Sequence, residues 1–162
     1  MVDRTSVHFV NLNGETNSLI EAIKVGDLPA VSDILENAVQ HNILIVWLLT
    51  ITSCGIRPLY QAAKLGFVDI VVLLVQYGFN DWKNCVSAID DGKSPQHAAA
   101  EHGHLELLSI IYDNFGVDLG LKSAANEETP MYLAASNGHL EICQFLAEKG
   151  VRLDVNGIMP NL

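Results

Sequence analysis

Four side chains of metal-binding type lie within eight residues of one another: His97, Glu101, His102 and His104. His97 and Glu101 are four residues apart, so on a helix they share one face. An imidazole and a carboxylate on one face could hold a metal ion such as Zn²⁺. The sequence therefore raises a metal site as one interpretation of this stretch.

Other arrangements that carry out catalysis are weak or missing from the sequence. His139 and Cys143 have helical spacing, but no third group is evident that would orient the histidine toward a thiolate. There is no Gly-rich phosphate-binding loop, no HExxH and no Gly-x-Ser-x-Gly. We therefore expect a protein without a catalytic site.

The histidine-rich stretch belongs to a unit that recurs along the chain. Its copies begin at Arg57, Ser94 and Thr129, and in each copy a Pro precedes a Gly by eight residues. A second Gly follows 12 or 13 residues later, and the three prolines are 37 and 35 residues apart. Self-similarity at this period predicts stacked helical units.

Each unit has the signals of two short helices. Ser94 and Thr129 are side chains that cap a helix N-terminus, whereas Arg57 is not, and Pro at the next position suits the first helical turn. The second helix is predicted to bury an apolar stripe: Leu105, Leu108, Ile111 and Tyr112 in one unit, and Leu140, Cys143, Phe145 and Leu146 in the next. One such helix pair cannot cover its own apolar face, so neighbouring units must stack.

The repeated unit resembles the ankyrin repeat. The family's Thr-Pro-Leu-His start reads RPLY, SPQH and TPMY here, followed each time by an Ala-Ala pair and then by GF, GH and GH. A weaker unit, which lacks the Pro, precedes them at residues 17–38. The resemblance implies an all-α, ankyrin-type solenoid of stacked helix-turn-helix repeats with hairpin-like finger loops.

The resemblance covers roughly residues 17–155 and implies one domain over residues 1–162. The repeats are expected at about 17–38, 57–80, 94–120 and 129–154, and residues 155–162 form either a tail or the start of a truncated fifth repeat. The resemblance also gives His97 and His104 structural positions, with His97 hydrogen-bonded within the turn. We therefore expect no metal and no cofactor. Tyr60 and Tyr132 replace the start-motif histidine in the neighbouring repeats, so no ladder of these histidines is expected.

The composition of the chain restricts its expected cellular location and the kinds of partner it could bind. A net charge of −10 and a pI of about 4.8 argue against sequence-independent nucleic-acid binding and favour either a partner with a basic surface or solubility alone. Three cysteines without CxxC, and no secretory leader, predict free thiols and a cytoplasmic or nuclear location. The longest apolar run, Ile43–Leu49, falls far short of the roughly 20 residues that cross a bilayer, so we expect no membrane insertion.

Two of the predicted fingers are longer than the family pattern. The first contains the apolar run 43–49, which either packs onto the first two repeats or forms a surface for self-association or a partner. The second contains Trp82, which either folds back onto the stack or projects as a binding residue.

The resemblance implies a non-catalytic protein–protein interaction module. Contacts in this family come from finger tips and from the exposed face of the first helices, which implies binding residues Ser53, Cys54, Ile56, Lys64, Leu65, Asp90, Asp91, Lys93, Glu101, His102, Asn126, Glu128, Ser136 and Asn137, with Trp82 as a further candidate. Asp90 and Asp91 lie at a predicted turn and are expected to be exposed and replaceable. The alternative is a regulatory or targeting segment of a larger multidomain enzyme or channel.

Overall fold

The computed structural model describes residues 17–40, 57–83, 85, 87 and 90–151, and within these ranges all regular secondary structure is helical. A helical segment over residues 17–25 precedes α2 (Leu28–Gln40). The remaining helices are α4 (Pro58–Leu65), α5 (Val68–Gln76), α6 (Pro95–Glu101), α7 (Leu105–Phe115), α8 (Pro130–Ser136) and α9 (Leu140–Glu148). The apolar run 43–49, residues Ser53, Cys54 and Ile56, and the segment 155–162 lie outside the described residues.

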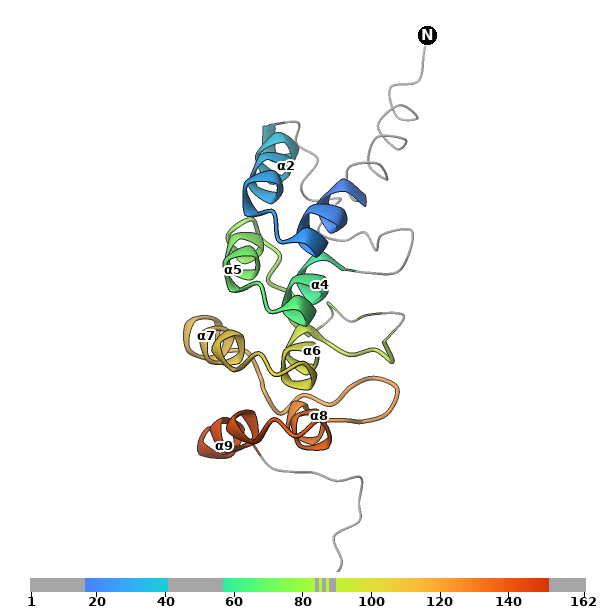
Figure 1. Ribbon diagram of the computed structural model, residues 1–162, viewed down its shortest axis with the longest axis vertical. Coiled ribbons are helices and arrows are strands. Elements are labelled where there is room, and N and C mark those ends of the chain that lie inside the picture. Colours follow the sequence, from blue (N-terminus) through green and yellow to red (C-terminus); the bar gives the residue numbers. More distant parts are fainter. Residues whose placement is uncertain (1–16, 41–56, 84, 86, 88–89, 152–162) are drawn as a thin grey trace, which may run out of the picture.

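The helices form two layers (Figure 1). An inner layer contains α4, α6 and α8, which contact one another in that order, and an outer layer contains α2, α5, α7 and α9. The loops before α6 and α8 extend past the inner helices on the side away from the outer layer. This arrangement confirms the expected all-α solenoid.

The helix starts follow the capping signals in the sequence. The Thr129 hydroxyl accepts a hydrogen bond from the Tyr132 backbone N–H, at 3.2 Å, and so caps α8. Ser94 begins α6 with a capping box in which His97 takes the position usually held by Glu or Gln. Arg57 provides no side-chain cap for α4, as expected.

The inner layer is packed through alanine. Ala62, Ala63, Ala99 and Ala100 are completely buried, since small side chains let neighbouring inner helices approach closely. In the last pair Ala134 is buried but Ala135 is exposed, because among the described residues no further inner helix packs against α8.

One expected core residue lies on the surface. Leu140 was predicted to be part of the apolar stripe of α9, but it is 79% exposed, whereas Ile142 and Leu146 are buried. Leu140 is two residues, or about 200°, from Ile142 around the helix, so both cannot face the inner layer. Helical spacing alone allowed either Leu140 or Ile142 to face the inner layer. In the structure Ile142 is buried, because α9 packs against α8 on that side.

Candidate partner-binding surface

Six candidate residues form a row along the ends of the inner helices, here called the inner row: Lys64, Leu65, Glu101, His102, Ser136 and Asn137. Each consecutive inner helix contributes two of them at its C-terminal end. His102, Ser136 and Asn137 are exposed, and Leu65 is at the border of exposure, whereas Lys64 and Glu101 are half-buried. Because α4, α6 and α8 stack on one another in that order, these helix ends follow one another along the stack (Figure 1).

The two described finger tips lie beside each other and are linked. The Asp91 carbonyl accepts a hydrogen bond from the Ala125 N–H at 3.2 Å, and the Asn126 side-chain amide donates to the Asp91 carboxylate at 3.3 Å. Asp91 and Glu127 both have positive φ angles, of 53° and 54°, which mark tight turns. The tips therefore form one connected edge.

Asp90 does not behave as predicted. It is half-buried and accepts hydrogen bonds from the Tyr60 hydroxyl at 2.7 Å and from the Lys64 ammonium at 3.0 Å. Partial burial alone would raise the pKa of Asp90, but these hydrogen bonds and the positive charge of Lys64 hold it below its ordinary value. Burial, followed by the bond to Asp90, raises the pKa of Tyr60 well above its usual range. The expectation that Asp90 is freely exposed and replaceable was wrong, because this side chain ties its finger to α4.

A second ion pair lies one repeat further along. Lys93 donates to both carboxylate oxygens of Glu101, at 2.9 and 3.0 Å, and its side chain is 12% exposed. Lys64 and Lys93 thus neutralise Asp90 and Glu101, respectively. The carboxylates that remain at the described finger tips belong to Asp91, Glu127 and Glu128, and the ion pair from Lys122 to Glu127 is long, at 4.0 Å.

His97 is part of the scaffold. Its Nδ1 accepts a hydrogen bond from the Ser94 N–H at 3.3 Å, so its Nε2 carries the proton and donates to the Glu128 carbonyl at 3.0 Å. Burial lowers the pKa of His97 to about 4. Both ring nitrogens are occupied by protein groups, and within the described residues no three His, Cys, Asp or Glu side chains are grouped to hold a metal.

The other repeated histidines bind backward along the stack. The His104 Nε2 donates to the Lys64 carbonyl at 3.0 Å, and the His139 Nε2 donates to the Glu101 carbonyl at 2.9 Å. A Cβ on Gly66, whose φ is 75°, would collide with the His104 ring. This ladder was not predicted from the sequence. The recurring Gly-His dipeptide was its only signal, because the bonded residues are about forty positions apart.

Trp82 lies against the stack. Its ring is half-buried and stacks on Phe115 of α7, with a centroid distance of 5.9 Å and an interplanar angle of 25°. The sequence allowed Trp82 either to fold back onto the stack or to project from it. The side chain folds back, and it packs on the repeat that follows its finger. A contact between Trp82 and a partner remains a prediction.

The described cysteines are free: Cys85 is buried and Cys143 half-buried. Burial raises the pKa of the Cys85 thiol to about 11, which disfavours the reactive thiolate. Among the helices of the described ranges, none is both long enough and apolar enough to span a membrane.

Within the described residues, the two layers, the linked finger tips and the inner row define a solenoid of helical repeats with an extended surface. Comparison with family models agrees. A model described as ankyrin repeats (3 copies) matches residues 19–123 and 59–157. The chain belongs to the ankyrin-repeat family.

The chain also resembles part of a curated protein. The chain is 33% identical over 98 residues to the inactive serine/threonine-protein kinase TEX14 from Bos taurus. The match covers 60% of this chain but only 6% of the relative, so it concerns one segment of a much longer protein.

Proposed function

We propose that the chain is a non-catalytic binding module that holds a protein partner against the inner row and the finger tips. The observation that carries this proposal is the regular arrangement of the inner row along the stack. The six residues of the inner row occupy matching positions of α4, α6 and α8. The backbone carbonyls of Lys64 and Glu101 are bonded to His104 and His139, and their side chains are held by the two ion pairs. A preorganised row loses little conformational entropy when a partner binds.

The charges at the finger tips indicate the chemistry of the partner. Lys64 and Lys93 are each paired with a carboxylate, so the inner row is close to neutral. At the tips Asp91 and Glu127 are exposed, whereas Glu128 is half-buried with its Oε2 enclosed, and the ion pair from Lys122 to Glu127 is long, so the tips keep an excess of negative charge. A partner that places basic side chains at the tips and neutral polar or apolar groups on the row would be favoured, and its association would slow as salt rises.

Photo-crosslinking tests the proposed surface. A photoreactive amino acid at His102, in the inner row, is compared with the same amino acid at Asn80, an exposed position in the loop after α5. Each labelled protein is illuminated in an extract of cells that express the chain, and the adducts are identified by mass spectrometry. We expect one protein to be crosslinked at His102 and not at Asn80.

A double variant tests the same site by affinity. Leu65→Glu with His102→Glu should weaken capture of the crosslinked protein while circular dichroism stays unchanged, because both side chains are at the surface. Asn80→Glu adds the same type of charge elsewhere and should have no effect. Equal capture by the double variant and by the wild type would rule out the inner row.

A second proposal is that the chain acts as a regulatory or targeting segment of a larger protein. It rests on the relative, in which the matched segment is 6% of a protein named as an inactive kinase. The measurement is the mass of the natural product, by immunoblot with an antibody to α6–α9. A band near 17.7 kDa would contradict this proposal, and a much larger band would support it.

The cellular setting is also a proposal. Free Cys85 and Cys143 suit a reducing compartment, which supports the cytoplasm or the nucleus. Exclusion of nucleic acid rests on the net charge of −10. Self-association through residues 43–49 remains a prediction from the sequence.

A further inference from the structure

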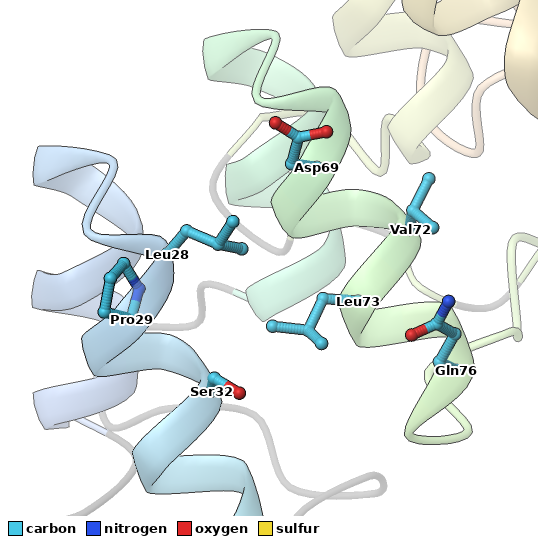
Figure 2. A pocket seen from close by; sticks show the side chains of 7 residues that line it. All are labelled: Leu28, Pro29, Ser32, Asp69, Val72, Leu73 and Gln76. Atoms are coloured by element: carbon cyan, nitrogen blue, oxygen red, sulfur yellow. The ribbon is translucent and has the colours of Figure 1, made fainter.

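The outer layer contains two grooves at equivalent places in the stack. One lies between α2 and α5 and has a volume of about 480 Å³, and the other lies between α7 and α9 and has a volume of about 680 Å³. Figure 2 shows the first groove, into which Leu28 and Leu73 point from the two helices. The shared geometry makes the α2/α5 groove an internal reference for the α7/α9 groove.

The α7/α9 groove has an apolar floor. Leu105 and Ile110 contribute from α7 and Phe145 from α9, and all three are only half-buried. The ring of Phe145 is held in place by an edge-on contact with Tyr112 and by the Lys149 ammonium, 5.4 Å from its centroid. The floor is therefore a fixed apolar strip that water still reaches.

Three exposed carboxylates line the same groove: Glu106, Glu141 and Glu148. Among the described residues none of them forms an ion pair with Lys or Arg, and Glu148 receives only a hydrogen bond from Gln144, at 3.0 Å. The α2/α5 groove contains a single carboxylate, Asp69, and Gln76 stands where Glu148 stands in the other. The acidic rim is thus specific to one groove and is not a property of the outer layer.

Helix stability does not account for the whole rim. Glu106 and Glu141 lie in the first turns of α7 and α9, where the helix dipole favours a negative charge. Glu148 is the last residue of α9, where the dipole disfavours one. A carboxylate that opposes its own helix, beside an apolar floor, is consistent with selection for a bound cation.

We propose that the α7/α9 groove binds a basic amphipathic helix of a protein partner. Glu141 and Glu148 are two turns apart, roughly 10 Å along α9. A helix lying in the groove can place apolar residues at i and i+4 on the floor and lysines or arginines seven residues apart at the rim. Charge complementarity and the exposed apolar strip both select this occupant. The site is on the opposite layer from the inner row, and it does not depend on the function proposed above.

The test uses a defined peptide and intact protein. The probe is a synthetic amphipathic helix of about 15 residues, with leucines at i and i+4 and lysines beside them. Two control peptides have the same composition in scrambled order, or glutamine in place of lysine. Affinity is measured by fluorescence anisotropy at low and at physiological salt, and the contact site is mapped by amide chemical shifts.

Two variants with equal charge change locate the site. The first carries Glu106→Gln, Glu141→Gln and Glu148→Gln. The second carries Asp33→Asn, Glu36→Gln and Asp69→Asn, three exposed carboxylates on α2 and α5. We expect the first to weaken peptide binding about tenfold and the second less than twofold, since each exposed charge pair contributes up to about fivefold. Chemical shifts should change on α7 and α9.

Several results would overturn the proposal. Equal loss in both variants would show attraction to net charge alone, and equal binding of the scrambled peptide would show that the apolar floor is not used. Shifts confined to the inner row or to the α2/α5 groove would place the peptide elsewhere. Glu148→Gln alone should weaken binding severalfold without lowering the thermal midpoint. A lower midpoint would mean that Glu148 is retained for the fold.

Discussion

The inner and outer layers of this solenoid treat their charged side chains differently. On the inner side Lys64 is bound to Asp90 and Lys93 to Glu101, and His97 links two successive fingers. On the outer side one ion pair joins Lys149 to Asp113, at 3.0 Å, whereas Glu106 and Glu141 are exposed to water. Polar groups that are bonded to one another hold a surface in shape, whereas free carboxylates attract a partner and leave the backbone unaffected. The same repeat thus forms two different surfaces, and substitutions of charged residues should affect both fold and binding more often on the inner side.

The largest contrast is expected from the same substitution in the two layers. Ala99→Leu introduces three carbon atoms at a completely buried position of α6, which is packed between α4 and α8. Overpacking of this kind costs on the order of 3 kcal/mol in a site enclosed on both sides. Ala147→Leu makes the identical change at an exposed position of α9 and should shift stability by less than about 0.5 kcal/mol.

Urea unfolding of both variants measures the difference. Unequal midpoints with equal m-values would attribute the change to packing rather than to the denatured state. If Ala99→Leu unfolds at the same urea concentration as Ala147→Leu, then the close approach of the inner helices is not what holds the stack together.

The next effect concerns acid stability. Burial depresses the pKa of folded His97 to about 4, against an ordinary value of 6.5, so below pH 6.5 the unfolded chain binds a proton that the folded chain does not. Stability is therefore complete above about pH 6.5 and falls as the pH drops toward 4. Between pH 7.5 and pH 5 this single group should account for a loss of about 2 kcal/mol.

Two histidine substitutions, one inside α6 and one at its C-terminal end, isolate that effect. His97→Gln should be less stable than the wild type at pH 7.5 and should lose less further stability on acidification to pH 5. His102→Gln removes an exposed histidine at the end of the same helix and controls for the loss of a histidine at the surface. Parallel slopes for the wild type and His97→Gln would show that His97 is protonated equally in both states.

Features within one repeat could be predicted from the sequence, and features between repeats could not. The Pro and Gly positions predicted the helices, and Ser94 and Thr129 predicted two N-terminal caps. These signals could be read from the sequence because they act over three or four residues. The bond from Tyr60 to Asp90 and the bond from His139 to Glu101 join residues 30 and 38 positions apart. Only stacking brings such residues together, and a period in the sequence does not specify which side chains then meet.

The candidate binding residues also divide into features set within one repeat, which were predicted, and contacts between repeats, which were not. The turn at Asp90 and Asp91 was correctly predicted, but Asp90 faces α4 while Asp91 faces solvent, and no local pattern distinguishes the two. For Trp82 the sequence left open whether the side chain folds back or projects, and it stacks on Phe115 of the next repeat, a contact between repeats. The α7/α9 groove was missed because it needs the relative placement of two helices from different repeats.

The smallest contrast is expected between these adjacent aspartates. Asp90→Asn removes the charge that pairs with Lys64 and weakens the bond from the Tyr60 hydroxyl, whereas Asp91→Asn changes an exposed side chain and tolerates the same positive φ. We expect a loss of about 1 kcal/mol for Asp90→Asn and almost none for Asp91→Asn. Urea unfolding at pH 7 measures both.

The pH dependence of this pair supplies the decisive control. The pKa of folded Asp90 is held below its ordinary 3.8, so its contribution is present above that value and is lost as the pH falls through the folded pKa. The gap in stability between the two variants should therefore be full at pH 7 and close in acid. A partner that contacts the finger tips should bind Asp91→Asn more slowly, although its fold is intact, because a solvent-facing charge acts mainly on encounter. If Asp90→Asn and Asp91→Asn are equally stable at pH 7, the bonds to Tyr60 and Lys64 contribute nothing to the fold, and the inner side is no more preorganised than the outer.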